Sequence, residues 1–140
     1  MNHKSTDSPF HAPVFAEAIS KGGRTGTLSS PGRPIDITLG VAGASVNPEL
    51  LFAGAYAACF HSAMIGLATK LGTPLVDSTV RARTCILADG EGGGRLTVEL
   101  YASVPGFVAN QVRDLMEKAH QICAYSRALR GDAVVTLLVD

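Results

Sequence analysis

Two cysteines, Cys59 and Cys123, are the residues of this chain whose type and placement could support redox chemistry. Cys59 lies inside an apolar segment, and Cys123 ends a second segment of helical periodicity far along the chain. Two thiols that meet can form and reopen a disulfide, one acting as the nucleophile and the other capturing its oxidised sulfur. Burial alone favours a simpler interpretation, in which Cys59 is a small packed hydrophobic residue. A nucleophilic Cys59 needs a lowered thiol pKa and therefore nearby positive charge, which its own helix lacks.

The other cysteine and the histidines give weaker signals. Cys85 lies in a strand pattern, and we interpret it as a sheet residue without a chemical role. His61 follows Cys59 by two positions and points to another helical face, which makes it a poor general base. His120 shares the face of Cys123, and we interpret it as a surface histidine. Neither the four histidines nor the three cysteines have metal-ligand spacing, so we expect no metal site.

The composition fits one domain of 140 residues. Hydrophobic residues make up 46% and charged residues 17%, so we expect part of the surface to be buried against a second copy of the chain. The 12 basic and 12 acidic residues give no net charge, which argues against nucleic acid or an anionic membrane as the partner. The polar N-terminus has no signal-peptide core, and no uninterrupted apolar run reaches the roughly 18 residues of a membrane span. We therefore expect a cytoplasmic protein.

The periodicity predicts an α+β fold in the order βββ-α-ββ-α-β, with mostly antiparallel strands around a long buried helix. Residues 1–12 are expected to form a flexible arm and residues 13–140 a single domain. The expected strands are 14–19, 24–29, 35–39, 79–87, 95–104 and 133–139, and the expected helices are 47–70 and 108–123, with a short turn capped by Ser126.

The two helices have different signatures. Asn47, Pro48 and Glu49 supply a cap, a proline at the first helical position and an acid in the first turn of the long helix. Because this helix is apolar on nearly every face, it is expected to be buried all round. The second helix is amphipathic and should end near Cys123, which we place beside a loop rather than deep in the core.

Four stretches together resemble the organic hydroperoxide resistance (Ohr) proteins of the OsmC-like superfamily. They occur in the expected order over nearly the whole chain, and the combination is more specific than any one piece. The stretches are Gly22-Gly23-Arg24-Thr25-Gly26 with Ser29-Ser30, Asn47-Pro48-Glu49-Leu50-Leu51-Phe52, Tyr56-Ala57-Ala58-Cys59-Phe60, and Cys123-Ala124-Tyr125-Ser126 with Arg130-Gly131.

The resemblance implies a thiol-dependent peroxidase. Cys59 would be the peroxidatic cysteine and Cys123 the resolving cysteine, while Arg24 and Glu49 would complete the site. Cys59 would become a sulfenic acid and then a disulfide with Cys123. The resemblance implies no bound cofactor, but an external dithiol reductant such as the lipoyl group of a lipoylated protein.

Three positions depart from the common pattern of that family. Ala124 stands where the family commonly has proline, Leu50 where it has glutamine, and Arg127 where it has asparagine. None is one of the four reactive positions. We expect the missing proline to loosen the loop that holds Cys123, and Arg127 to alter what approaches the site.

The apolar side chains near Cys59 favour an organic substrate. Phe52, Tyr56 and Phe60 suit a hydroperoxide with an alkyl or aryl tail better than hydrogen peroxide. Other functions stay open: an OsmC-like peroxidase or thiol-dependent hydrolase with another substrate, a two-cysteine redox sensor, and a structural domain with idle thiols.

Helix geometry predicts a homodimer. Glu49 and Cys59 are ten residues apart on one helix, so their backbones lie about 15 Å apart at about 1.5 Å rise per residue. Because no side chains close that gap, a Glu49 that serves Cys59 would serve the cysteine of another subunit. Two apolar helices packed in a two-fold dimer would place the sites at the interface.

Overall fold

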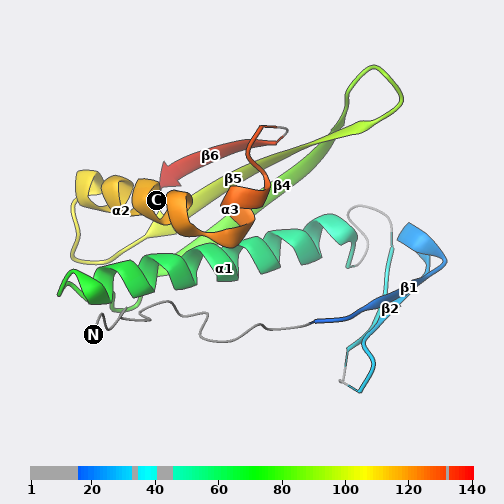
Figure 1. The fold of residues 1–140 in the computed structure, drawn as a ribbon, viewed down its shortest axis with the longest axis horizontal. Helices are drawn as coiled ribbons and strands as arrows, with labels where there is room; N and C mark the ends of the chain where they lie inside the picture. The colour runs from blue at the N-terminus through cyan, green and yellow to red at the C-terminus, as the bar shows by residue number, and fades with distance from the viewer. Residues whose placement is uncertain (1–15, 33–34, 41–45, 132) are drawn as a thin grey trace, which may run out of the picture. The chain divides into compact units, whose positions relative to one another are not determined.

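The computed structural model describes residues 16–32, 35–40, 46–131 and 133–140. These residues belong to two compact units, one ending at Asn47 and the other beginning at Pro48. Figure 1 shows their helices and strands, which make a mixed α+β fold with two separate sheets. The predicted fold class and the order of the main elements are confirmed.

The N-terminal unit contains a three-stranded antiparallel sheet. Its strands are β1 (Ile19–Lys21), β2 (Thr27–Ser29) and β3 (Asp36–Thr38), in the order β1-β2-β3. The 3-10 turn η1 (Gly23–Thr25) separates the first two. Of the strand predicted over 14–19, only Ile19 is in β1, and the first two residues lie outside the described part of the chain.

The strand predicted over 24–29 is also shorter, because its first residues form η1. Gly22 and Gly23 adopt φ of 83° and 61°, which favours glycine and turns the chain sharply. A Cβ at Gly26 would overlap the carbonyl oxygen of Lys21, so the chain closes on itself there. This tight loop presents Arg24.

The C-terminal unit is built on a second three-stranded sheet in the order β4-β5-β6. The strands β4 (Thr79–Ala88) and β5 (Gly94–Ser103) form an antiparallel hairpin, and β6 (Val134–Val139) pairs with β5 in parallel. Val98, Leu100 and Ala102 of the central strand are at most 1% exposed. The residues between them face the other side, where Tyr101 receives the Arg81 guanidinium at 3.8 Å from its ring centroid.

Helix α1 (Pro48–Lys70) begins and ends as predicted and packs against β4 and α2. Its start is fixed to the sheet by a hydrogen bond of 2.9 Å from the Thr84 hydroxyl to the Glu49 carbonyl oxygen. Tyr56, Phe60, Met64 and Ala68 recur at every fourth position and enter the core.

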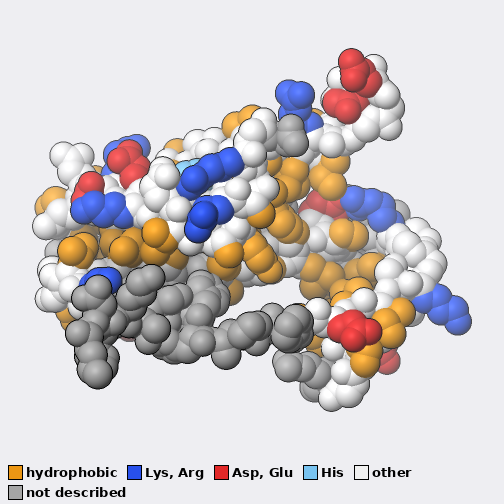
Figure 2. All heavy atoms as spheres, in the orientation of Figure 1, with side chains coloured by type: hydrophobic (Ala, Val, Ile, Leu, Met, Phe, Trp, Pro, Cys, Tyr) orange, Lys and Arg blue, Asp and Glu red, His pale blue; other side chains and the backbone are white. Residues whose placement is uncertain are grey.

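Within the single chain, α1 is not buried on every face. A second stripe of mostly small side chains is exposed, comprising Gly54, Ala55, Ala58, Ser62, Ile65 and Gly66. By length and composition alone α1 could cross a membrane, but the core helix of a soluble protein passes the same test. Figure 2 shows hydrophobic side chains also reaching the surface of the visible face.

The predicted second helix is α2 (Ala109–Ile122), which ends beside Cys123 as expected, and a short helix, α3 (Ala124–Ala128), follows where a turn was predicted. Val112, Leu115, Met116 and Ala119 are buried as the periodicity predicts, whereas Val108 and Ile122 at the two ends are 65% and 50% exposed. The Gln111 side chain accepts a hydrogen bond of 3.1 Å from the Val108 N–H, which caps the start of α2.

Candidate functional site

Cys59 and Cys123 lie in contact. Their sulfur atoms are 3.5 Å apart although the residues are 64 positions apart in the chain, and both are free thiols. Cys59 is partly exposed on α1, whereas Cys123 is 2% exposed between α2 and α3. The prediction that Cys123 lies outside the core is therefore wrong: it ends a helix, but the helix ends within the core.

The chain leaves the helical conformation at Cys123, where φ is −61° and ψ is 127°. The Cys123 N–H still bonds to the Ala119 carbonyl at 2.8 Å, while its own carbonyl accepts the Arg127 N–H at 3.0 Å. One residue thus closes α2 and opens α3. This geometry directs the first N–H groups of α3 toward α1.

The Cys59 thiol has a raised pKa, chiefly because burial disfavours its charged form. Hydrogen bonds from the Tyr125 and Ala124 backbone N–H groups act in the opposite direction, and Cys123 raises the pKa further. Within the C-terminal unit, burial outweighs the amides. Activation of Cys59 as a thiolate therefore calls for positive charge in addition to these amides.

An aromatic cluster lies beside the thiols. The Phe52 and Tyr125 rings are stacked with centroids 6.3 Å apart, and Tyr56 meets both Phe52 and Tyr125 edge to face at 5.9 Å. Tyr56 and Phe60 are fully buried, whereas Phe52 is partly exposed. Of the three predicted substrate contacts, Phe52 is the one that solvent reaches.

A buried hydrogen bond accompanies the thiol pair. The Tyr56 and Ser126 hydroxyls are 2.6 Å apart, and both residues are fully buried. The prediction that Ser126 caps a short turn is wrong: Ser126 lies inside α3, whose first residue follows the cap Cys123, and its hydroxyl pairs with Tyr56. No local pattern in the sequence indicates this pairing, since the two residues are 70 positions apart.

The two charged candidates belong to different units. Glu49 lies in the first turn of α1, and the helix runs unbroken from it to Cys59. The predicted separation of about 15 Å between their backbones therefore applies within one chain. Arg24 lies in η1 of the N-terminal unit, so its role at Cys59 stays a prediction.

The sequence pattern of the OsmC-like protein family matches residues 41–138. An organic hydroperoxide resistance protein of Xanthomonas axonopodis pv. citri is 39% identical, with the match covering 93% of this chain and 96% of that protein. OhrA of Bacillus subtilis is 35% identical, over 91% of this chain and 96% of its own length.

This chain belongs to the OsmC-like family. Solved structures agree at the level of the fold. An organic hydroperoxide resistance protein from Legionella pneumophila has a TM-score of 0.85 and 34% identity, covering 92% of this chain and 98% of its own. A related protein from Vibrio cholerae, with captopril bound in one of its active sites, has a TM-score of 0.84 and 32% identity over 95% and 96% of the two chains.

The two histidines that the structure describes, His61 and His120, are both partly buried. His61 shares a hydrogen bond of 2.9 Å with the Ser78 hydroxyl, and burial lowers its pKa. His120, predicted to lie on the surface, is partly buried instead, and its Nδ1 atom is buried without a hydrogen-bond partner. In the part of the chain that the structure describes, no group of three or more His, Cys, Asp or Glu side chains could hold a metal ion.

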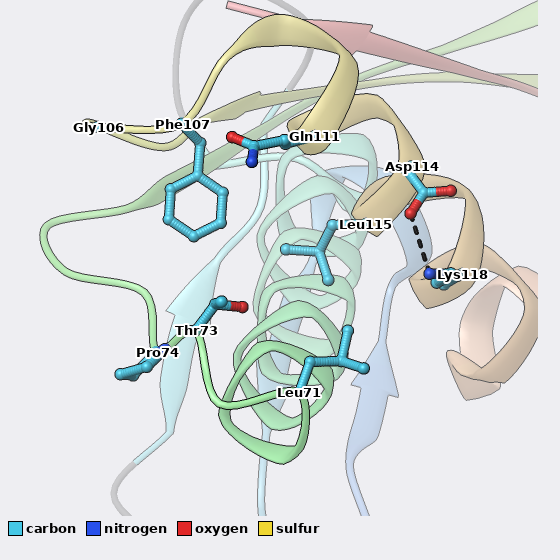
Figure 3. A pocket seen from close by; sticks show the side chains of 9 residues that line it. All are labelled: Leu71, Thr73, Pro74, Gly106, Phe107, Gln111, Asp114, Leu115 and Lys118. Carbon is cyan, nitrogen blue, oxygen red and sulfur yellow. Dashed lines mark ion pairs between the residues drawn. The ribbon is translucent and has the colours of Figure 1, made fainter.

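Two hollows flank α1 at its opposite ends. Figure 3 shows one of about 470 Å³ beside the C-terminal end of α1, where Phe107 and Leu115 face the loop at Thr73 and Pro74. Its Asp114 and Lys118 already form an ion pair of 2.9 Å, and neither thiol lines it.

The other hollow, of about 290 Å³, lies at the N-terminal end of α1. It is mainly apolar and is lined by Pro48, Glu49, Phe52, Ile86, Gly94 and Leu96. This hollow therefore combines a predicted catalytic carboxylate with a predicted substrate contact.

Proposed function

We propose that the chain protects against organic hydroperoxides as a cysteine-based peroxidase, reducing them to alcohols with electrons from an external dithiol. The observation that carries the proposal is the 3.5 Å contact between the free thiols of Cys59 and Cys123. Relatives that share at least 35% of their residues with this chain over more than 90% of its length are named organic hydroperoxide resistance proteins.

In the first step, the Cys59 thiolate attacks one oxygen of the hydroperoxide. An S–O bond forms, the O–O bond breaks, and the leaving alkoxide takes a proton to become an alcohol. Cys59 becomes a sulfenic acid. The α3 N–H groups of Tyr125 and Ala124 stabilise the thiolate before the attack.

In the second step, Cys123 attacks the oxidised sulfur of Cys59. The S–S bond forms, the S–O bond breaks, and the departing hydroxide takes a proton to become water. The dithiol then reopens the disulfide by exchange. Because Cys59 is partly exposed and Cys123 is buried, the incoming thiolate attacks Cys59 and Cys123 leaves.

Arg24 would supply the positive charge that the Cys59 environment lacks, and would also stabilise charge on the leaving oxygen. Glu49 would hold the Arg24 guanidinium in a bidentate pair that fixes its orientation. The family resemblance supports both roles. The requirement for charge is supported independently by the raised pKa of the Cys59 thiol.

The substrate would be an organic hydroperoxide rather than hydrogen peroxide. The hollow that contains Glu49 and Phe52 is mainly apolar, so it suits an alkyl or aryl group. A catalytic efficiency that is higher with hydrogen peroxide than with cumene hydroperoxide would contradict this preference.

The active form would be a cytoplasmic homodimer that needs neither nucleic acid nor a membrane. Its interface would cover the exposed stripe of α1 that includes Ala55, Ala58 and Ile65. Small side chains allow two helices to approach closely. A two-fold arrangement would bring Glu49 of one copy to the site of the other, as the separation along α1 requires.

Steady-state consumption of cumene or tert-butyl hydroperoxide with dihydrolipoamide tests the proposal. Turnover should disappear in Cys59→Ser, and slow or stop in Cys123→Ser. Cys85→Ser is the matched control and should keep the native rate, since Cys85 is exposed on the far face of the sheet. A single stoichiometric oxidation without turnover would indicate a redox sensor, and no reaction at all would indicate structural thiols.

A further inference from the structure

The hydrogen bond between Tyr56 and Ser126 joins the same two segments of the chain as the contact between the Cys59 and Cys123 thiols. Tyr56 and Cys59 are three positions apart on α1, so they share a face of the helix. Ser126 and Cys123 are also three positions apart, across the start of α3. The two segments are therefore joined twice, at 2.6 Å between hydroxyls and at 3.5 Å between sulfurs.

We infer that Tyr56 and Ser126 are positioning residues for disulfide formation, because their hydrogen bond holds the segment that carries Cys123 against the helix that carries Cys59. This inference rests on the proposed peroxidase chemistry. It assigns a role to two hydroxyls that touch neither peroxide nor sulfur in any step above.

The Tyr56–Ser126 hydrogen bond is buried, so its loss should disturb the attachment of α3 to α1. The hydroxyls of Tyr56 and Ser126 belong to fully buried residues, so each needs a hydrogen-bond partner. Helix α3 has five residues and is too short to hold its own place. Its attachment to α1 therefore depends on tertiary contacts, which include the buried hydroxyl pair and the hydrogen bonds from the α3 N–H groups to Cys59.

The two chemical steps depend differently on this attachment. Attack on the peroxide uses the Cys59 sulfur, with the α3 amides as an aid. Disulfide formation additionally requires the Cys123 sulfur to move from 3.5 Å to covalent distance along the correct line. Loss of the bond should therefore slow the second step more than the first.

Single-turnover kinetics of the reduced protein with cumene hydroperoxide separate the two steps. Sulfenic acid is trapped with a dimedone-type reagent, and the disulfide is followed by mass spectrometry. In Tyr56→Phe and in Ser126→Ala we expect disulfide formation to slow about tenfold, the size expected for one buried hydrogen bond. We expect sulfenic acid formation to change less than about threefold, and over-oxidised Cys59 to accumulate with excess peroxide.

The double variant Tyr56→Phe with Ser126→Ala tests whether the two hydroxyls act through one bond. If they do, its disulfide step should be no slower than that of the slower single variant. Tyr101→Phe is the matched control, since it deletes a hydroxyl bonded at 2.9 Å to Glu99 on the far face of the sheet. It should resolve its sulfenic acid at the native rate.

The results distinguish this inference from the function on which it rests. If the native protein forms sulfenic acid and disulfide, but the variants resolve at the native rate or lose both steps equally, the positioning role is overturned. Independent, multiplying effects in the double variant would also overturn it. If the native protein forms no disulfide at all, the peroxidase proposal fails first.

Discussion

Closing the Cys59–Cys123 disulfide should stabilise the fold, and the structure sets the size of the effect. The cysteines are 64 positions apart, so the bond would close a long loop in the unfolded chain. A loop of that length corresponds to a stabilisation of about 4 kcal/mol from lost chain entropy. The opposing cost is the strain of drawing the two sulfur atoms from 3.5 Å to about 2.05 Å. A small movement of α3 is enough to close this distance.

Denaturant and thermal unfolding of the reduced and oxidised forms, at one fixed protein concentration, would measure this difference. A stabilisation of about 4 kcal/mol in a chain of this size should raise the unfolding temperature by roughly 12–16 °C. The measurement is best made in the Cys85→Ser background, because exposed Cys85 could otherwise form intermolecular disulfides.

Cys123→Ser treated with the same oxidant is the control and should show no such rise. An oxidised form that is less stable than the reduced form would refute the reasoning. It would mean that disulfide closure strains the fold by more than the whole entropic gain, so that the reduced structure does not hold the thiols ready to react.

Other perturbations have expected outcomes with defined directions. Arg24→Met should move the pH midpoint of the peroxide reaction upward, because it removes the positive charge proposed to offset the burial that raises the pKa of the Cys59 thiol; stopped-flow rates across pH measure the change. Ala124→Pro should raise the same pKa by deleting one N–H donor, as read from thiolate absorbance. Burial lowers the pKa of the His61 imidazole below its ordinary 6.5. The folded protein should therefore lose stability as the pH falls below 6.5, and His61→Gln should lessen the decrease of the unfolding temperature over that pH range. Ile65→Arg, on the exposed stripe of α1, should yield monomers by size-exclusion chromatography and abolish turnover.

Much of this fold could be predicted from local patterns. The cap, proline and acid at Asn47, Pro48 and Glu49 fixed the start of α1, and the glycine-rich turn before Gly94 fixed the β4–β5 hairpin. These signals act within a few residues. The short strands of the N-terminal unit were harder, because Arg24 and Thr25 belong to a 3-10 turn where a strand was predicted.

The candidate site depended on contacts that no local pattern contains. The sequence indicated Cys59 and Cys123 as a pair, but spacing alone could not show that they meet across 64 positions. The burial of Cys123 was missed because a helix end usually lies near the surface, whereas this one is covered by the packing of α1 and α3. The uniformly apolar sequence of α1 could not show which of its faces enters the core of the chain and which stays exposed, because hydrophobicity does not distinguish a core from an interface between copies.

Ala124, where the family pattern commonly has proline, affects both the stiffness of the backbone beside Cys123 and the pKa of the Cys59 thiol. A proline there would restrict the chain where α2 ends. Here the break forms without it, held by the bond from Cys123 N–H to the Ala119 carbonyl and by the Tyr56–Ser126 pair. Alanine also keeps an N–H that proline lacks, and that N–H lowers the pKa of the Cys59 thiol. Ala124 thus gives up backbone stiffness near Cys123 for an additional hydrogen bond to Cys59, while the buried Tyr56–Ser126 pair joins the two segments that carry the cysteines.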